Sequence, residues 1–138
     1  MPMPKTPLVT VDAVIIYENN SIVLIHRRND PFKGELALPG GFVDIGETVE
    51  EACIRETYEE TNIHIKIINL IGVFSDPKRD PRGHNISIAF LCKPSSTDEN
   101  PKAKDDAKSI EIIPLKKLSS LSLAFDHYHI IKASGIID

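Results

Sequence analysis

The sequence predicts an α/β fold, and three observations support this prediction. Segments with the alternation of β-strands precede a central helix, similar segments follow it, and a second helix closes the chain. The chain has 138 residues and 41% hydrophobic content, which suits one compact domain with a real core. We therefore expect a single domain over residues 1–138, in which a β-sheet lies between helices.

Two strands joined by a hairpin are expected before the central helix. Residues 18–21 are typical of a hairpin turn, which leads into a strand over 22–26. A loop over 29–34 then precedes a short strand over 35–38. The first strand covers residues 8–17 with strand spacing, and the side chains on one of its faces are Val9, Val11, Ala13, Ile15 and Tyr17.

The central helix is expected to begin after Thr48 and to end at Asn62. Thr48 followed by Glu51 forms a capping box, in which each residue satisfies a backbone N–H of the other. Asparagine tolerates the left-handed conformation that ends many helices. Before the helix, Gly40 and Gly41 follow a proline and predict a turn, because glycine adopts backbone angles that other residues avoid.

Three carboxylates lie on one side of this helix. At about 100° per residue, Glu56, Glu59 and Glu60 fall within an arc roughly 100° wide. Such carboxylates repel one another and lose hydration, so they need a compensating cation, and hard oxygen ligands suit magnesium or manganese. An acidic helix is also often a solvated face, but here the arc continues an apolar stripe, which favours a metal site. The apolar members of that arc are Val49, Ala52 and Cys53.

The chain after this helix returns to strands and closes with a helix. The alternation slips near residues 67–68, which suggests a β-bulge. Phe125, Tyr128 and Ile131 recur at a spacing of three and are expected to make core or dimer contacts. The expected elements are a strand over 63–74, a loop with three cations over 76–83, a strand over 86–92, a polar loop over 94–104, a strand over 107–113, one helical turn over 114–118 and a helix over 124–133.

Composition excludes several classes of protein. No apolar run approaches the roughly 20 residues of a membrane span, and the first five residues are too short and polar for a signal peptide. Cys53 and Cys92 lack metal-type spacing and are interpreted as buried free thiols in a reducing compartment. The net charge of -4 argues against a nucleic-acid platform, although local basic clusters can still bind a small anion. We expect a cytoplasmic protein that binds neither nucleic acid nor membranes.

The turn and the central helix resemble the Nudix hydrolase box. The pattern is glycine, five residues, glutamate, seven residues, Arg-Glu, two residues and Glu-Glu. Two positions depart from the usual form, since Thr57 replaces an aliphatic residue and Asn62 replaces glycine. Neither change removes a carboxylate, so we expect activity to survive both. The resemblance covers nearly the whole chain and implies a Nudix-type α/β/α sandwich with a mixed β-sheet and a loop-helix-loop catalytic motif. The matching positions are Gly41, Glu47, Arg55, Glu56, Glu59 and Glu60.

The resemblance also implies metal-dependent hydrolysis of a diphosphate linkage. Glu56 and Glu60 would bind the principal Mg2+ ion, with Mn2+ as an alternative and with help from the carbonyl of Gly40 or Gly41. Glu59 would bind a second ion or hold the nucleophilic water. A salt bridge between Glu47 and Arg55 would hold the loop to the helix, so both residues count as structural before catalytic. The general base stays open between the box carboxylates and three downstream candidates, Glu99, Asp105 and Asp106.

Residues outside the box are similar to the ADP-ribose pyrophosphatase branch of the Nudix family. The similar segments are 75–84 and 124–127, together with Pro77 in the mid-teens of residues past the box. They imply that ADP-ribose is cleaved to AMP and ribose 5-phosphate. Members of this branch are commonly homodimers. The candidate substrate ligands are Arg27, Arg28, Arg79, Arg82 and His84, each of which also fits an exposed loop or strand end, and Phe42 or Phe74 would stack on adenine or belong to the core.

Three alternatives stay open. The first is a Nudix enzyme that acts on nucleoside triphosphates or oxidised nucleotides. The second is a non-catalytic regulatory module that binds nucleotide sugars as signals, although such modules often lose a box carboxylate that this chain retains. In the third, the acidic helix is only structural.

Overall fold

Seven strands form one mixed sheet in the computed structural model, which describes residues 2–18, 20–96, 99–102 and 107–138. The strand order is β3-β2-β1-β6-β5, with β4 paired to β1 and β7 paired to β2. Strands β1 and β6 pair in parallel, and the other pairs are antiparallel. The elements in chain order are β1 (Leu8–Tyr17), β2 (Ser21–Arg27), β3 (Leu36–Ala37), β4 (Gly40–Phe42), α1 (Val49–Thr61), β5 (Ile65–Phe74), β6 (Asn85–Pro94), β7 (Ala107–Pro114), the 3-10 helix η1 (Leu115–Ser120) and α2 (His127–Ala133).

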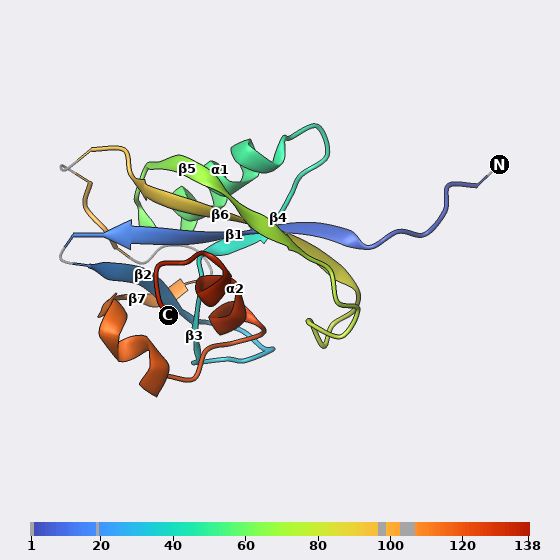
Figure 1. Ribbon diagram of the computed structural model, residues 1–138. Helices are drawn as coiled ribbons and strands as arrows, with labels where there is room; N and C mark the ends of the chain where they lie inside the picture. The colour runs from blue at the N-terminus through green and yellow to red at the C-terminus, as the bar shows by residue number, and fades with distance from the viewer. Residues whose placement is uncertain (1, 19, 97–98, 103–106) are drawn as a thin grey trace.

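Helices cover both faces of this sheet, so the expected α/β/α sandwich is confirmed. Figure 1 shows α1 on one side of the strands and α2 on the other. Ala52 and Cys53 of α1 are fully buried against the face of β1 that carries Val11, Ala13 and Ile15. A second cluster on the opposite face contains Leu118 of η1 and Ile130 and Ile131 of α2. None of the described helices is long and apolar enough to cross a membrane.

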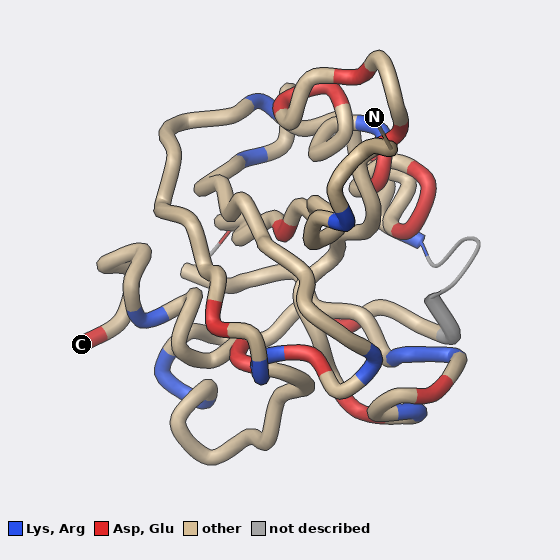
Figure 2. Tube along the Cα trace, turned by 90° about the vertical axis from the view of Figure 1, so that its right-hand side faces the viewer, with Lys and Arg blue, Asp and Glu red and all other residues tan. Residues whose placement is uncertain are grey.

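Charged residues of both signs are mixed along the described chain. Figure 2 shows Lys and Arg residues interspersed with Asp and Glu along the described chain. A protein that binds nucleic acid gathers its basic residues on one face or along one helix.

Both predicted ends of the central helix are confirmed. The Glu51 backbone N–H donates to Thr48 Oγ1 at 3.1 Å, and the Thr48 N–H donates to Glu51 Oε1 at 2.9 Å. Asn62 has φ 64° and ψ 19°, and its N–H donates to the Tyr58 carbonyl. These two caps fix the ends of the helix that carries Glu56, Glu59 and Glu60.

Thr57 occupies an apolar position of α1 with a polar side chain. Its side chain is fully buried, and among the described residues its Oγ1 is the one buried side-chain polar atom without a hydrogen-bond partner. An unpaired buried hydroxyl loses its hydration without compensation. We therefore expect Thr57→Val to raise the free energy of unfolding by about 1 kcal/mol, measured by urea denaturation. Thr61→Val is the matched control and should destabilise, because Thr61 Oγ1 donates to the Thr57 carbonyl and accepts from the Ile63 N–H.

Two elements differ from the sequence-based expectation. The expected turn at Gly40 and Gly41 is the strand β4, which pairs with β1 because glycine lets the two backbones approach closely. The last helix begins at His127, not at residue 124, because Phe125 has φ 53°, which a right-handed helix cannot contain. The Ala124 N–H instead donates to the Leu36 carbonyl at 2.8 Å. The other elements are present with slightly shifted ends, and the predicted bulge in β5 is confirmed by a register shift between Ile67 and Asn69.

Candidate functional site

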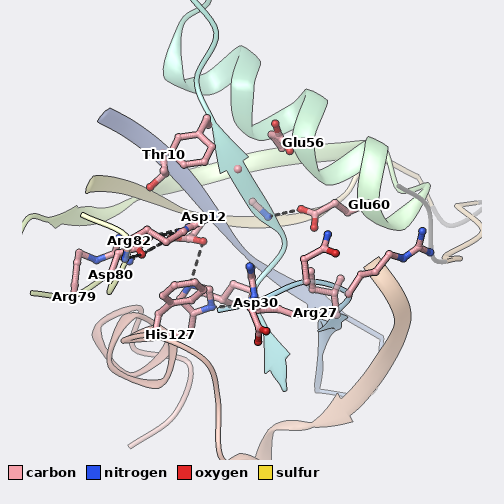
Figure 3. A pocket seen from close by; sticks show the side chains of 18 residues that line it. Thr10, Asp12, Arg27, Asp30, Glu56, Glu60, Arg79, Asp80, Arg82 and His127 are labelled. Carbon is pink, nitrogen blue, oxygen red and sulfur yellow. Dashed lines mark hydrogen bonds and ion pairs between the residues drawn. The ribbon is translucent and has the colours of Figure 1, made fainter. Parts of the chain in front are cut away.

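An open cavity of about 240 Å³ lies beside the second half of α1. Its walls come from β1, β2, β4, α1, the loop between β5 and β6, and the start of α2. Figure 3 shows Glu56 and Glu60 on one side of the cavity, and Arg79, Asp80, Arg82 and His127 on another. Segments far apart in the sequence therefore meet here, with carboxylates and guanidinium groups facing a shared space.

Two of the three box carboxylates line this cavity. Glu60 is buried, and its Oε1 accepts from the Gly40 N–H at 2.7 Å. Glu56 accepts from Arg55 Nη1 at 2.8 Å. Glu59 lies outside the lining, is 41% exposed and accepts from the same Nη1 at 3.2 Å. The structure thus brings Glu56 and Glu60 together at the cavity and leaves Glu59 beside it.

Arg55 connects the helix to the loop that precedes it. Its Nε donates to Glu47 Oε2 at 2.7 Å and its Nη2 donates to Glu47 Oε1 at 2.9 Å, so the predicted salt bridge is present. Nη2 also donates to the Phe42 carbonyl at 3.0 Å. Hydrogen bonds from Arg55 and from the Asp44 backbone lower the pKa of Glu47 to about 2. The hydrogen bonds that Arg55 donates to Glu47 and to Glu56 raise the pKa of Arg55 in turn. The guanidinium is a permanent counter-charge that fixes the loop.

The chemistry of this acidic side fits a hard divalent cation. Glu47, Glu56 and Glu59 share the one guanidinium of Arg55, so their charges are only partly neutralised, and Glu60 adds another carboxylate. Carboxylate oxygens are the ligands that magnesium and manganese prefer. Within the described residues, no group of three or more His, Cys, Asp or Glu side chains is already arranged around one point that could hold a metal ion. The carboxylates therefore suit a divalent cation in donor type and in charge. Two of the predicted ligands, Glu56 and Glu59, are paired with Arg55 in this structure.

Gly41 lies directly against the carboxylate of Glu56. A Cβ at this position would be 2.4 Å from the Glu56 Cδ and Oε2 atoms, closer than atoms can pack. Glycine is therefore needed for the backbone of β4 to run beside the carboxylate. The main chain at Gly41 therefore lies next to the Glu56 carboxylate.

Arg79 is held at the cavity by a carboxylate and is more buried than Arg82. Arg79 is 5% exposed, and its Nε and Nη2 donate to the Asp126 carboxylate at 2.9 and 2.7 Å. Burial alone would lower the pKa of Arg79, but the hydrogen bonds and charge of Asp126 raise it. This pair fastens the loop between β5 and β6 to the start of α2. Arg27, Arg28 and Arg82 also line the cavity.

Asp80 holds Arg82 at the cavity. Arg82 Nη2 donates to Asp80 Oδ2 at 2.7 Å, Arg82 Nε donates to Oδ1 at 3.1 Å, and Asn85 Nδ2 donates to Oδ2 at 2.8 Å. Burial opposes ionisation of Asp80, but hydrogen bonds from Arg82 and Asn85 outweigh it and lower the pKa of Asp80 to about 2. Arg82 remains 43% exposed, so its charged end stays accessible.

His127 is buried in a single protonation state. The Leu38 N–H donates to its Nδ1 at 2.9 Å, so that nitrogen carries no proton. The proton is therefore on Nε2, which lies 3.3 Å from Asp12 Oδ1. Complete burial lowers the pKa of His127 and outweighs the opposite effect of Asp12 and Asp126. Ser87 donates to the other oxygen of Asp12.

Several candidates lie away from the cavity. His84 is exposed and its ring contacts the Ser75 carbonyl. Glu99 accepts from the His64 N–H just beyond the end of α1. Phe74 packs in the core and contacts His129, whereas Phe42 lines the cavity. Asp105 and Asp106 lie outside the described residues.

Sequence reasoning missed several lining residues, among them Asp12, Asp30, Asp80 and Phe125. Asp12 interrupts the apolar run of β1, and a charge in such a run requires a buried partner, so this signal was available. Asp30 and Asp80 lie in loops, where a carboxylate has no distinguishing pattern. The apolar spacing predicts Phe125 on the face of the last helix, but that helix begins only at His127. Only tertiary structure distinguishes these last three positions.

Two lowered carboxyl pKa values make the free energy of unfolding depend on pH in the acid range. Glu47 and Asp80 both have folded-state pKa values of about 2, below their ordinary values of 4.5 and 3.8. Stability from a depressed pKa is present above the ordinary value and is lost as pH falls through the folded one. We expect the free energy of unfolding, from urea titrations, to fall from about pH 4.5 to about pH 2. The stability difference between wild type and Asp80→Asn should shrink as pH falls from about 3.8 to about 2; a constant difference would contradict this assignment.

Comparison with known proteins decides the family. The model of the NUDIX domain matches residues 6–133. The chain belongs to the Nudix family. This confirms the resemblance carried by the box, and the helix that bears Glu56 and Glu60 is the Nudix helix. The family is typically dependent on divalent metal ions.

Similar Nudix proteins are associated with ADP-ribose. An ADP-ribose pyrophosphatase of Methanocaldococcus jannaschii is 54% identical over 126 residues, which are 91% of this chain and 72% of that protein. The NUDIX domain of Shewanella oneidensis NrtR, solved with ADP ribose, has a TM-score of 0.85 and 28% identity, covering 95% of this chain and 88% of that one.

A third relative has been solved with a nucleotide and a metal ion. It is the bifunctional NMN adenylyltransferase/ADP ribose pyrophosphatase of Francisella tularensis, complexed with AMP and a Mn ion. It has a TM-score of 0.81 and 37% identity, covering 93% of this chain. This Nudix chain corresponds to 41% of the length of that protein.

Proposed function

We propose that the protein hydrolyses ADP-ribose to AMP and ribose 5-phosphate in a reaction that requires Mg2+ or Mn2+. The observation that carries this proposal is the cavity, in which carboxylates of α1 lie on one side and arginines on another. A diphosphate ester needs both, because its negative charge must be neutralised before water can attack phosphorus. The 54% identity to an ADP-ribose pyrophosphatase supports the choice of substrate.

The acidic side would hold the metal. Glu56 and Glu60 are the proposed principal ligands, with the carbonyl of Gly40 or Gly41, and Glu59 is the proposed ligand of a second ion or of water. A bound dication supplies charge neutralisation and makes water a better nucleophile. Glu56 and Glu60 border the cavity, and a carboxylate there is proposed to accept the proton of the attacking water.

The basic side would hold the phosphates. Arg27, Arg28 and Arg82 line the cavity and are proposed to bind the diphosphate through charge-assisted hydrogen bonds. Arg79 is proposed to position the loop between β5 and β6, since Asp126 already takes two of its nitrogens. His84 is left out of this set because its side chain lies away from the cavity. Phe42 lines the cavity and is the aromatic residue proposed to stack on adenine.

A substrate panel tests this proposal. Purified protein with Mg2+ would be given ADP-ribose, an 8-oxo-purine nucleoside triphosphate, diadenosine polyphosphates and nucleotide sugars, and the products separated by ion-exchange chromatography. We expect ADP-ribose to have the highest kcat/KM and to yield AMP and ribose 5-phosphate. Much faster cleavage of the oxidised triphosphate would favour the first alternative. Tight binding of ADP-ribose without turnover, with Mg2+ or Mn2+, would favour a regulatory module.

We also propose that two copies of the chain associate through the sheet. Residues 67–74 of β5 and 85–92 of β6 contain no charged side chain. Leu70 and Val73 of this edge strand are 56% and 57% exposed, and their partners on β6 belong to or contact the core cluster under α1. An uncharged patch suits self-association, because a symmetric dimer places the same surface on both sides. Light scattering after size-exclusion chromatography tests this, with Leu70→Glu expected to be monomeric and wild type dimeric.

The expected compartment is the cytoplasm. Cys53 and Cys92 are both free and buried, and a reducing compartment keeps such thiols free. The substrate proposed above is a soluble nucleotide, which agrees with this location.

A further inference from the structure

Phe125 lines the cavity together with two of its arginines. The Arg27 guanidinium carbon lies 5.0 Å from the centroid of the Phe125 ring, and that of Arg82 lies 5.6 Å from it. Phe32 and His127 pack against the same ring, with centroid distances of 4.7 and 5.2 Å. A guanidinium within about 6 Å of a ring centroid is attracted by the ring electrons. One aromatic side chain thus contacts both cations.

The backbone at Phe125 is held in an unfavourable conformation. Its φ is 53°, in the left-handed region that bulky residues seldom occupy. Such a residue keeps this conformation where surrounding contacts outweigh the strain, and these positions concentrate at functional sites. A helix over 124–133 would instead direct the ring along the apolar face that carries Ile131. The break before α2 is therefore what brings the ring to the cavity.

Each of the two arginines is also held at a second point. Arg27 Nε donates to the Pro31 carbonyl at 2.7 Å. Arg82 donates through Nε and Nη2 to Asp80, and its guanidinium carbon also lies 5.5 Å from the centroid of the Phe42 ring. A side chain that is ordered before a ligand arrives loses less entropy on binding. The Phe125 ring is the side chain that contacts both Arg27 and Arg82.

We infer that Phe125 is a positioning residue for the diphosphate of the substrate. Its ring holds Arg27 and Arg82 so that their charged ends meet the two phosphate groups, at the cavity that Glu56 and Glu60 also line. This inference rests on the proposed function, because it assigns the phosphate-binding arginines of the same site. Phe125 itself contacts no reacting atom, so its loss affects binding of the diphosphate more than turnover.

Kinetics of Phe125→Leu and Phe125→Tyr with ADP-ribose test the inference. Leucine keeps the apolar volume but removes the ring, so we expect KM to rise about ten-fold with kcat within about two-fold of wild type. Tyrosine keeps the ring and should restore the wild-type KM. The inhibition constant of inorganic pyrophosphate should rise in parallel with KM in Phe125→Leu. Phe74→Leu is the matched control, since that ring contacts His129 away from the cavity and its loss should leave KM unchanged.

The outcomes separate the inference from the proposed function. An unchanged KM in Phe125→Leu, a loss confined to kcat, or equal defects in the leucine and tyrosine variants would overturn the inference. If wild type does not cleave ADP-ribose, the proposed function fails, and calorimetric binding of pyrophosphate to the same variants still tests the positioning role. If Phe125→Leu does not fold, Phe125→Met tests the same contact: it keeps an apolar side chain but removes the ring, and should raise KM with kcat preserved.

Discussion

Glu60→Gln and Glu56→Gln are each expected to lower kcat for metal-dependent hydrolysis by about 10²- to 10⁴-fold. Both side chains line the cavity, and glutamine removes the negative charge while keeping the shape. The oxygen of a glutamine at position 60 can still accept the hydrogen bond from the Gly40 N–H, so thermal unfolding should change little. Steady-state kinetics at saturating Mg2+, compared with calorimetric Mg2+ binding, separate loss of metal from loss of proton transfer.

Two further variants of α1 make this result specific. Glu50→Gln in the first turn of the same helix is exposed and should retain wild-type kcat. Glu59→Gln should also lower hydrolysis if Glu59 is a ligand; a near-normal rate would restrict its role to pairing with Arg55. Chelation of divalent ions should abolish turnover in wild type, and addition of Mg2+ should restore it. Full activity in both the Glu56 and the Glu60 variants would rule out the proposed metal site.

Gly40→Ala is expected to destabilise the protein by about 3 kcal/mol and to abolish hydrolysis. A Cβ at Gly40 would lie 2.0 Å from the Val11 carbonyl oxygen and 2.8 Å from Asp12 Oδ1. The Val11 carbonyl is part of the backbone of β1, which pairs with β6 and β4, so it cannot move without breaking the sheet. Urea denaturation and ADP-ribose hydrolysis measure the two effects.

Gly72→Ala is the matched control for this substitution. Its Cβ would meet only the Phe74 ring at 3.6 and 3.7 Å, an ordinary contact, so the free energy of unfolding should stay within about 0.5 kcal/mol. Gly41→Ala should behave differently from both. Its Cβ would be 2.4 Å from the Glu56 carboxylate, which can swing aside, so activity should fall more than stability. Equal stabilities for the Gly40 and Gly72 variants would show that β4 is not tightly constrained.

Local signals in the sequence predicted most of the fold. Thr48 and Asn62 set the limits of α1 because a cap is decided by neighbouring residues. Alternation along residues 8–17 predicted a strand that places Val11, Ala13 and Ile15 on one face, and these three side chains pack in one cluster. The resemblance to the Nudix box predicted the pair of Glu47 and Arg55, which the structure contains.

Contacts between distant segments could not be predicted in the same way. The bond from Arg79 to Asp126 joins residues 47 positions apart, and nothing in either segment specifies the other. The contact between Asp12 and His127 likewise depends on how β1 and α2 are placed by the whole sheet. Phe125 illustrates a local failure: the apolar spacing was helical, but tertiary contacts imposed a left-handed backbone.

The hydrogen bond from the Leu38 amide to His127 prevents this histidine from transferring protons. An imidazole can shuttle protons only if each nitrogen can both gain and lose one, and here a main-chain donor permanently occupies one of them. His127 is thus a fixed dipole, not a relay. If the rate of hydrolysis bends near neutral pH, the inflection must originate in another group.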